Sequence, residues 1–120
     1  MKDKDTVTIW HNPKCSTSRN ALALIRDAGI DPVVRDYQKD PPSAQEIRDA
    51  LAALGVPARD LIRQKGTPYD DLGLGDPSLS DDDLIAAMAA HPILIQRPVV
   101  FSAKGAVIGR PVEAVRKVLP

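Results

Sequence analysis

The sequence predicts an α/β fold in which a four-stranded mixed sheet carries helices on its faces. The chain begins with an apolar run, a helical pattern and a second apolar run, which is the spacing of two parallel strands joined by a crossover helix. It ends with two short apolar runs around a turn, followed by a last helical pattern. Between these ends, helical patterns from about residue 43 to residue 91 predict a helical subdomain inserted into one domain that spans residues 1–120.

The first strand, helix and second strand are expected within residues 6–37. Residues 6–10 predict a buried strand, and residues 16–28 predict a helix that ends at Gly29. Residues 32–37 predict the second strand. The expected apolar face of the helix consists of Ala21, Leu22, Ile25 and Ala28.

The middle of the chain predicts helices separated by loops. Ser43 can cap the first of them with Glu46 completing a capping box, and Gly55 ends it. A short helix over residues 57–64, a loop over residues 66–77 and a helix capped by Ser80 follow. The side chains expected to point inward are Ile47, Leu51, Leu54, Leu61, Ile62, Tyr69, Leu72, Leu74, Leu84, Ile85 and Met88.

The C-terminal part predicts a hairpin and a helix. Residues 98–102 and 106–109 are the expected strands, with a turn between them. Pro111 can start the last helix, because proline is favoured at the first helical position. Its apolar stripe consists of Val112, Val115, Val118 and Leu119.

The composition excludes several classes of protein. With 43% hydrophobic residues, 27% charged residues and zero formal net charge, the chain has no general attraction to nucleic acid or to membranes. No apolar run reaches membrane-spanning length, and the charged start over residues 1–5 lacks a secretory signal. One cysteine cannot form an internal disulfide, so we expect a cytoplasmic protein, and we expect a monomer. No metal-ligand cluster or glycine-rich phosphate loop is present, so no bound metal or cofactor is expected.

Cys15 gives the strongest chemical signal. It is the only cysteine, and it ends the polar loop over residues 11–15 directly before the first predicted helix. The amides and the dipole of a helix start favour thiolate over thiol, and Lys14, Arg19 and His11 can add positive potential. The alternative is a small buried hydrophobic residue. The polar, cationic flanks favour a reactive thiolate.

Ser18 and His11 are candidates for tuning this thiol. In Cys15-Ser16-Thr17-Ser18, serine stands where a C-x-x-C motif carries its second cysteine. The Ser18 hydroxyl can donate a hydrogen bond to the thiolate, but it cannot resolve a mixed disulfide, so a redox cycle needs an external thiol. His11 can hold the thiolate electrostatically or serve as a turn residue, and both roles stay open.

Three arginines are candidates for binding an oxyanion beside Cys15. Arg63, Arg97 and Arg110 stand at the ends of predicted elements, where binding residues concentrate. A guanidinium suits this role because it donates paired hydrogen bonds to anionic oxygens. Sequence spacing does not decide whether the three converge, nor whether the Arg97–Pro98 bond is cis. The arginines that fit a solvated surface role are Arg26, Arg35, Arg48, Arg59 and Arg116.

Several ordered segments together carry a resemblance to a known family. They are Ile9-Trp10-His11-Asn12-Pro13-Lys14-Cys15-Ser16-Thr17-Ser18-Arg19-Asn20, Pro41-Pro42-Ser43, Leu61-Ile62-Arg63, Pro68-Tyr69, His91-Pro92-Ile93-Leu94-Ile95-Gln96-Arg97-Pro98-Val99-Val100 and Gly109-Arg110-Pro111. With these segments the chain resembles the glutaredoxin-coupled arsenate reductases, the ArsC family with a thioredoxin-like core. Ser16, the Ile-Gly-Arg-Pro segment and the end at Pro120 resemble its YfgD-like branch.

The resemblance implies an activity and a role for each candidate. Cys15 would attack arsenate, three arginines (Arg63, Arg97 and Arg110) would bind its oxygens, and His11 and Ser18 would tune the thiol. Glutathione, as the external thiol donor, would attack the adduct. Glutaredoxin would then clear the glutathione disulfide, and arsenite would leave.

Two other functions are compatible with the same fold. One is a monothiol, glutathione-linked oxidoreductase with another substrate, and the other is an Spx-like, non-catalytic transcriptional regulator that binds RNA polymerase. Many regulators of that type carry a Cys-x-x-Cys switch, and Ser18 argues against it here. The three candidate arginines favour an oxyanion enzyme.

Overall fold

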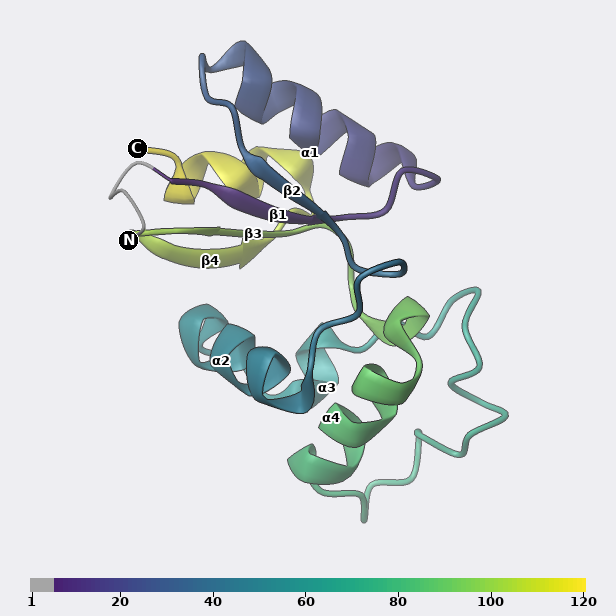
Figure 1. Ribbon diagram of the computed structural model, residues 1–120. Helices are drawn as coiled ribbons and strands as arrows, with labels where there is room; N and C mark the ends of the chain where they lie inside the picture. Colours follow the sequence, from purple (N-terminus) through teal and green to yellow (C-terminus); the bar gives the residue numbers. More distant parts are fainter. Residues whose placement is uncertain (1–5) are drawn as a thin grey trace. The chain divides into compact units, whose positions relative to one another are not determined.

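A computed structural model describes residues 6–120, and the charged start, on which the prediction of no export signal depends, lies outside the described residues. The chain divides into two compact units. Unit 1 comprises the chain up to Asp40 and from Arg97 onward, and unit 2 is Pro41–Gln96. The two ends of the chain therefore build one unit and its middle builds the other (Figure 1). Across residues 6–120, none of the helices is both long enough and apolar enough to span a membrane.

Unit 1 contains the predicted four-stranded mixed sheet, in the order β2-β1-β3-β4. Strand β1 runs parallel to β2 and antiparallel to β3, which also pairs antiparallel with β4. The prediction of a parallel pair with a crossover and of a C-terminal hairpin is therefore confirmed. The strand ends differ from the predicted ends by one or two residues, because pairing rather than apolar character defines them. The strands are β1 Thr8–His11, β2 Val33–Asp36, β3 Val99–Ser102 and β4 Gly105–Ile108.

Helix α1, Ser16–Asp27, is the crossover between β1 and β2. Cys15 is its N-cap residue, and Gly29 follows its end with φ of +82°, a left-handed conformation that favours glycine. Ala21 and Ile25 are fully buried, as predicted. Ala28 is exposed instead of buried, because it is the C-cap residue beyond the last regular turn.

The core of unit 1 lies between the sheet, α1 and the C-terminal 3₁₀ helix η2, Val112–Val118. Figure 1 shows α1 and η2 on the same side of the sheet. Burial of one large aliphatic side chain contributes about 1.5–3 kcal/mol, so this cluster holds α1, and with it Cys15, against the sheet. Its buried members are Val7, Ile9, Ala21, Ile25, Val100, Val115, Val118 and Leu119.

Unit 2 is helical. Its elements are α2 Ala44–Leu54, α3 Ala58–Leu61, α4 Asp81–Ala90 and the 3₁₀ helix η1 Pro92–Leu94.

Reciprocal hydrogen bonds cap the two longer helices of unit 2. The predicted capping box at Ser43 is confirmed, since its Oγ accepts from Glu46 N at 3.1 Å and its N donates to Glu46 Oε1 at 3.0 Å. Ser80 and Asp83 form the same pair of bonds, at 3.1 and 3.0 Å. The two serines therefore fix where α2 and α4 begin.

Two details of unit 2 differ from the prediction. The short helix ends at Leu61 instead of residue 64, because Ile62 adopts an extended conformation and pairs with Ile95. Leu72 is 41% exposed, whereas Tyr69 and Leu74 anchor the loop as predicted.

Two arginines that were expected to be solvated are half-buried instead. The guanidinium carbon of Arg35 lies 5.9 Å from the ring centroid of Trp10, within the range of a cation–π contact. Arg59 donates to the carbonyl oxygens of Leu74, at 3.0 Å, and Asp76, at 2.6 Å. Its role is therefore to tie the loop of unit 2 to α3.

Gly109 directly precedes Arg110, and substitution by alanine tests the packing at this point. A Cβ at residue 109 would lie 2.8 Å from Pro98 Cγ and 3.2 Å from Val115 Cγ2. We expect Gly109→Ala to destabilise the fold by about 1–3 kcal/mol, because neither the proline ring nor the core valine can withdraw freely. Urea denaturation measures this loss. The control is Gly75→Ala, whose Cβ would meet only ordinary contacts at 3.6 Å or more. Equal stability loss in both variants would contradict this assignment.

Candidate active site

A short loop between β1 and α1 presents Cys15. Its backbone N donates to Asn12 O at 3.0 Å, and Lys14 N donates to Asn12 Oδ1 at 3.0 Å. Asn12 is buried, whereas Pro13 and Lys14 at the tip of the loop are exposed. Both oxygens of Asn12 therefore fold the loop into a turn that places the cysteine directly before the first turn of α1.

The surroundings of Cys15 stabilise its thiolate. Partial burial raises the pKa of this thiol, but the backbone amides of Ser18 and Thr17 at the start of α1 lower it. A hydrogen bond from the Arg97 side chain and the charge of Arg110 lower it further. The net result is a pKa below the ordinary value of a cysteine thiol, so the nucleophilic form is favoured.

The hairpin brings Arg97 and Arg110 to the same sulfur. Arg97 precedes β3 and Arg110 follows β4, and these antiparallel strands place both residues at one end of the hairpin. Arg110 Nη2 donates to Cys15 Sγ at 3.5 Å, and its Nε donates to Arg97 O at 2.8 Å. The peptide bonds from both arginines to the following prolines are cis. Two of the three candidate arginines thus meet at the thiol.

Arg63, the third candidate, belongs to unit 2. It directly follows the extended Ile62, its backbone N donates to Leu94 O at 2.6 Å, and its Nε donates to Lys65 O at 3.1 Å. Its role toward an oxyanion stays a prediction.

Ser18 contacts the sulfur in a different way from the prediction. Its side chain is fully buried, with Oγ 2.7 Å from His11 Nδ1 and 3.0 Å from the backbone N of Asn12, which donates to it. The expectation that this hydroxyl donates to the thiolate is therefore wrong, since the backbone amide of Ser18 makes that contact. Through its bonds to His11 and Asn12, the hydroxyl instead connects the loop between β1 and α1 to the first turn of α1.

His11 has the turn-residue role that the sequence left open. Burial lowers its pKa, and the charges of Arg26 and Arg19 add to this against the opposing effect of Asp36. The ring is therefore neutral near pH 7 and offers no positive charge to the thiolate. Its bond to Ser18 Oγ makes it a support of the loop.

Tyr37 is a member of this site that the sequence did not single out. It follows β2 directly, is fully buried, and hydrogen bonds with the side chains of Arg97 and Asn12. The register could have located it, because His11 pairs with Asp36 and the next residues of both parallel strands leave the sheet at the same edge.

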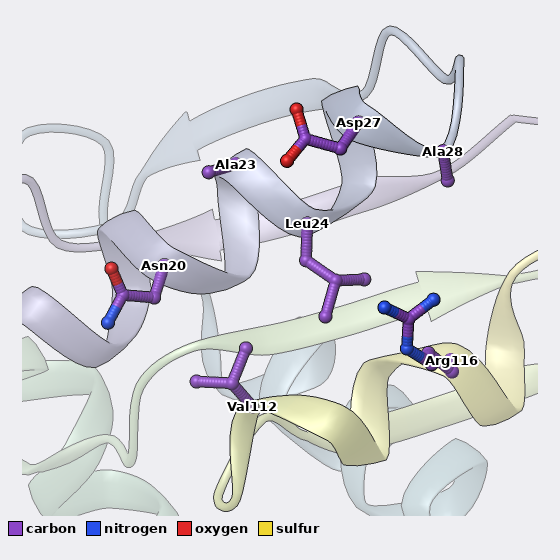
Figure 2. A pocket seen from close by; sticks show the side chains of 7 residues that line it. All are labelled: Asn20, Ala23, Leu24, Asp27, Ala28, Val112 and Arg116. Atoms are coloured by element: carbon purple, nitrogen blue, oxygen red, sulfur yellow. The ribbon is translucent and has the colours of Figure 1, made fainter.

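A hollow in unit 1 lies away from the thiol, since Cys15 is not among its lining residues. Its volume is about 360 Å³, and Figure 2 shows its lining side chains on α1 and η2, with Leu24 and Val112 pointing toward each other. Leu24 and Val112 also pack against the core of unit 1, so the hollow is a surface groove where α1 and η2 meet. Within residues 6–120, no group of three or more His, Cys, Asp or Glu side chains is arranged to hold a metal ion.

The class of the protein follows from three features: a four-stranded mixed sheet, a thiolate at the start of its crossover helix, and two guanidinium groups beside that thiolate. Together they define a thiol-dependent enzyme of thioredoxin-like fold. The chain belongs to the ArsC family, whose model matches residues 10–118.

The relatives and solved structures carry more particular names. An "Arsenate reductase" of Rhizobium meliloti is 56% identical over 96% of this chain and 82% of its own length. One of Escherichia coli is 46% identical over 95% of this chain and 81% of its own length. The structure "Arsenate reductase from Vibrio cholerae" superposes with a TM-score of 0.93 at 46% identity, covering 98% of this chain and all of that one.

Removal of either guanidinium should raise the pKa of Cys15. We expect Arg97→Ala and Arg110→Ala to shift the pH dependence of iodoacetamide alkylation upward, because each removes a group that stabilises the thiolate. Lys14→Ala is the matched control, since it removes an exposed cation next to Cys15 that is not among the groups found to lower the pKa of this thiol. A larger shift in Lys14→Ala than in Arg110→Ala would contradict this geometry.

His11 should make stability depend on pH. The folded-state pKa lies below the unfolded value of 6.5, so the unfolded chain binds the proton more readily. The contribution of neutral His11 is therefore fully present above pH 6.5 and is lost as the pH falls through that value toward the folded-state pKa. We expect His11→Gln to lose less unfolding free energy than wild type between about pH 7.5 and 5.5, as measured by urea denaturation. His91→Gln is the control. If the unfolding free energy of His11→Gln changed with pH as steeply as that of wild type, His11 would not be the source of the pH dependence.

Proposed function

We propose that this protein is an arsenate reductase with Cys15 as the nucleophile and an external thiol as the reductant. The single observation that carries the proposal is the contact of Arg97 and Arg110 with the Cys15 sulfur, with Arg110 Nη2 at 3.5 Å. Relatives named "Arsenate reductase" at 43–56% identity support the choice of substrate.

Arsenate is a tetrahedral oxyanion, and its oxygens need cationic donors. A guanidinium can donate two parallel hydrogen bonds to such oxygens. Arg110 is exposed and reaches the sulfur, so it can hold an oxygen beside the attacking atom. We assign Arg97 the same role from the other strand of the hairpin, because its side chain also contacts the sulfur.

The first steps build bonds between sulfur and arsenic. The Cys15 thiolate displaces one arsenate oxygen, which leaves as water, and an S–As bond forms while arsenic stays pentavalent. Glutathione then displaces a second oxygen as water, so that arsenic carries two sulfur ligands. The arginines stabilise the negative oxygens throughout, which is the largest contribution expected of such donors.

The reduction follows when a glutaredoxin thiolate attacks the glutathione sulfur. An S–S bond forms, the S–As bond breaks, and its electron pair stays on arsenic, which becomes trivalent. Water then cleaves the bond to Cys15, releasing arsenite and restoring the thiol. The donor thiols must be external because Cys15 is the only cysteine and Ser18 cannot form a disulfide.

A coupled assay tests the proposal. Purified protein is supplied with arsenate, glutathione, glutaredoxin, glutathione reductase and NADPH, and the loss of NADPH is followed. We expect turnover that Cys15→Ser abolishes and that Arg97→Ala or Arg110→Ala reduces by roughly 100-fold, the cost of removing one oxyanion donor.

Arg48→Ala serves as a control that should keep wild-type turnover, since it removes an exposed cation of α2 in unit 2. Turnover of a glutathionylated peptide without any reduction of arsenate would replace the proposal with a monothiol oxidoreductase. Arsenate reduction that survives Cys15→Ser would also overturn it.

A further inference from the structure

Tyr37 contacts two residues that determine the surroundings of Cys15. Its hydroxyl bonds with the side chains of Arg97, which contacts the sulfur, and Asn12, which folds the loop. Its exposed fraction is 0%, so the phenol touches neither solvent nor a substrate in solvent. Any effect of Tyr37 on the chemistry therefore passes through its two partners.

The direction of these bonds follows from the chemistry of the groups. A guanidinium can only donate, so the phenol oxygen accepts from Arg97. The bond from Asn12 also lowers the pKa of Tyr37, as a donor does, and so comes from the amide nitrogen. Asn12 Oδ1 is already engaged with Lys14 N at 3.0 Å, which agrees with that assignment.

A phenol has an advantage over a carboxylate as a partner for Arg97. Burial is the largest influence on Tyr37 and raises its pKa, so the ring stays neutral. A carboxylate in its place would fix the guanidinium equally well, but it would also cancel the positive charge. A neutral acceptor orients Arg97 and leaves its full charge for the thiolate and an oxyanion.

We propose that Tyr37 is a positioning residue that fixes the Arg97 guanidinium and the Asn12 turn relative to the Cys15 sulfur. An arginine side chain loses considerable rotamer freedom when it is held in place, and Tyr37 arranges this before a substrate arrives. The proposal deepens the proposed function, because it names how one oxyanion donor of the same site is oriented.

The test uses Tyr37→Phe, which removes only the hydroxyl. Alkylation of Cys15 by iodoacetamide is measured against pH, which needs no arsenate. We expect a higher pKa of Cys15 and alkylation at neutral pH that is slower by about 2- to 10-fold, the range for loss of one typical hydrogen bond. In the arsenate assay we expect a comparable fall in kcat/KM. Tyr69→Phe is the matched control, since Tyr69 is the other tyrosine and its hydroxyl contacts Arg59 in unit 2.

A double-mutant cycle separates positioning from general damage to the fold. If Tyr37 acts through Arg97 and Asn12, Tyr37→Phe has a smaller effect in an Arg97→Ala background, where only the Asn12 contact is left to lose, and its full effect in an Arg110→Ala background. An equal effect in all backgrounds, or a wild-type alkylation profile in Tyr37→Phe, would overturn the proposal. Failure of arsenate turnover in wild type would refute the proposed function and leave the alkylation result to decide on Tyr37.

Discussion

The hydrogen bond from Arg110 to the Cys15 sulfur is the interaction on which the site depends, because it joins two parts of the chain that are 95 residues apart. A cationic donor at 3.5 Å favours the anionic form of the sulfur, and the amides at the start of α1 act in the same direction. The negative charge of the thiolate in turn attracts both guanidinium groups, so it stabilises their positions beside the sulfur. Without the negative charge of the sulfur, the two positively charged guanidinium groups would repel each other.

The sheet makes this gathering possible. Because β3 pairs with both β1 and β4, one end of the hairpin lies beside the loop that follows β1. The parallel register of β1 and β2 brings Tyr37 out of the sheet next to Asn12. Each polar contact of the site in unit 1 therefore rests on strand pairing and on the apolar cluster beneath it.

Local patterns were sufficient for much of the fold. The capping box at Ser43, the stop at Gly29 and the hairpin turn depend on neighbours in sequence, and the structure confirms all three. Long-range contacts were harder to foresee. The Ser18 hydroxyl was assigned to the thiolate from its spacing alone, whereas a histidine seven residues earlier takes it in the fold. Tyr37 carried no motif, and only the register of two parallel strands reveals its neighbours.

The difference between a lone cysteine and a reactive one is the protonation state of its sulfur. The most direct measurement is the pH titration of thiolate ultraviolet absorbance in wild type, with Cys15→Ser subtracted as the background. The arrangement of Arg97, Arg110 and the α1 amides requires a pKa below that of a cysteine in an unstructured peptide. A value equal to or above that of the peptide would contradict a thiolate held by these groups.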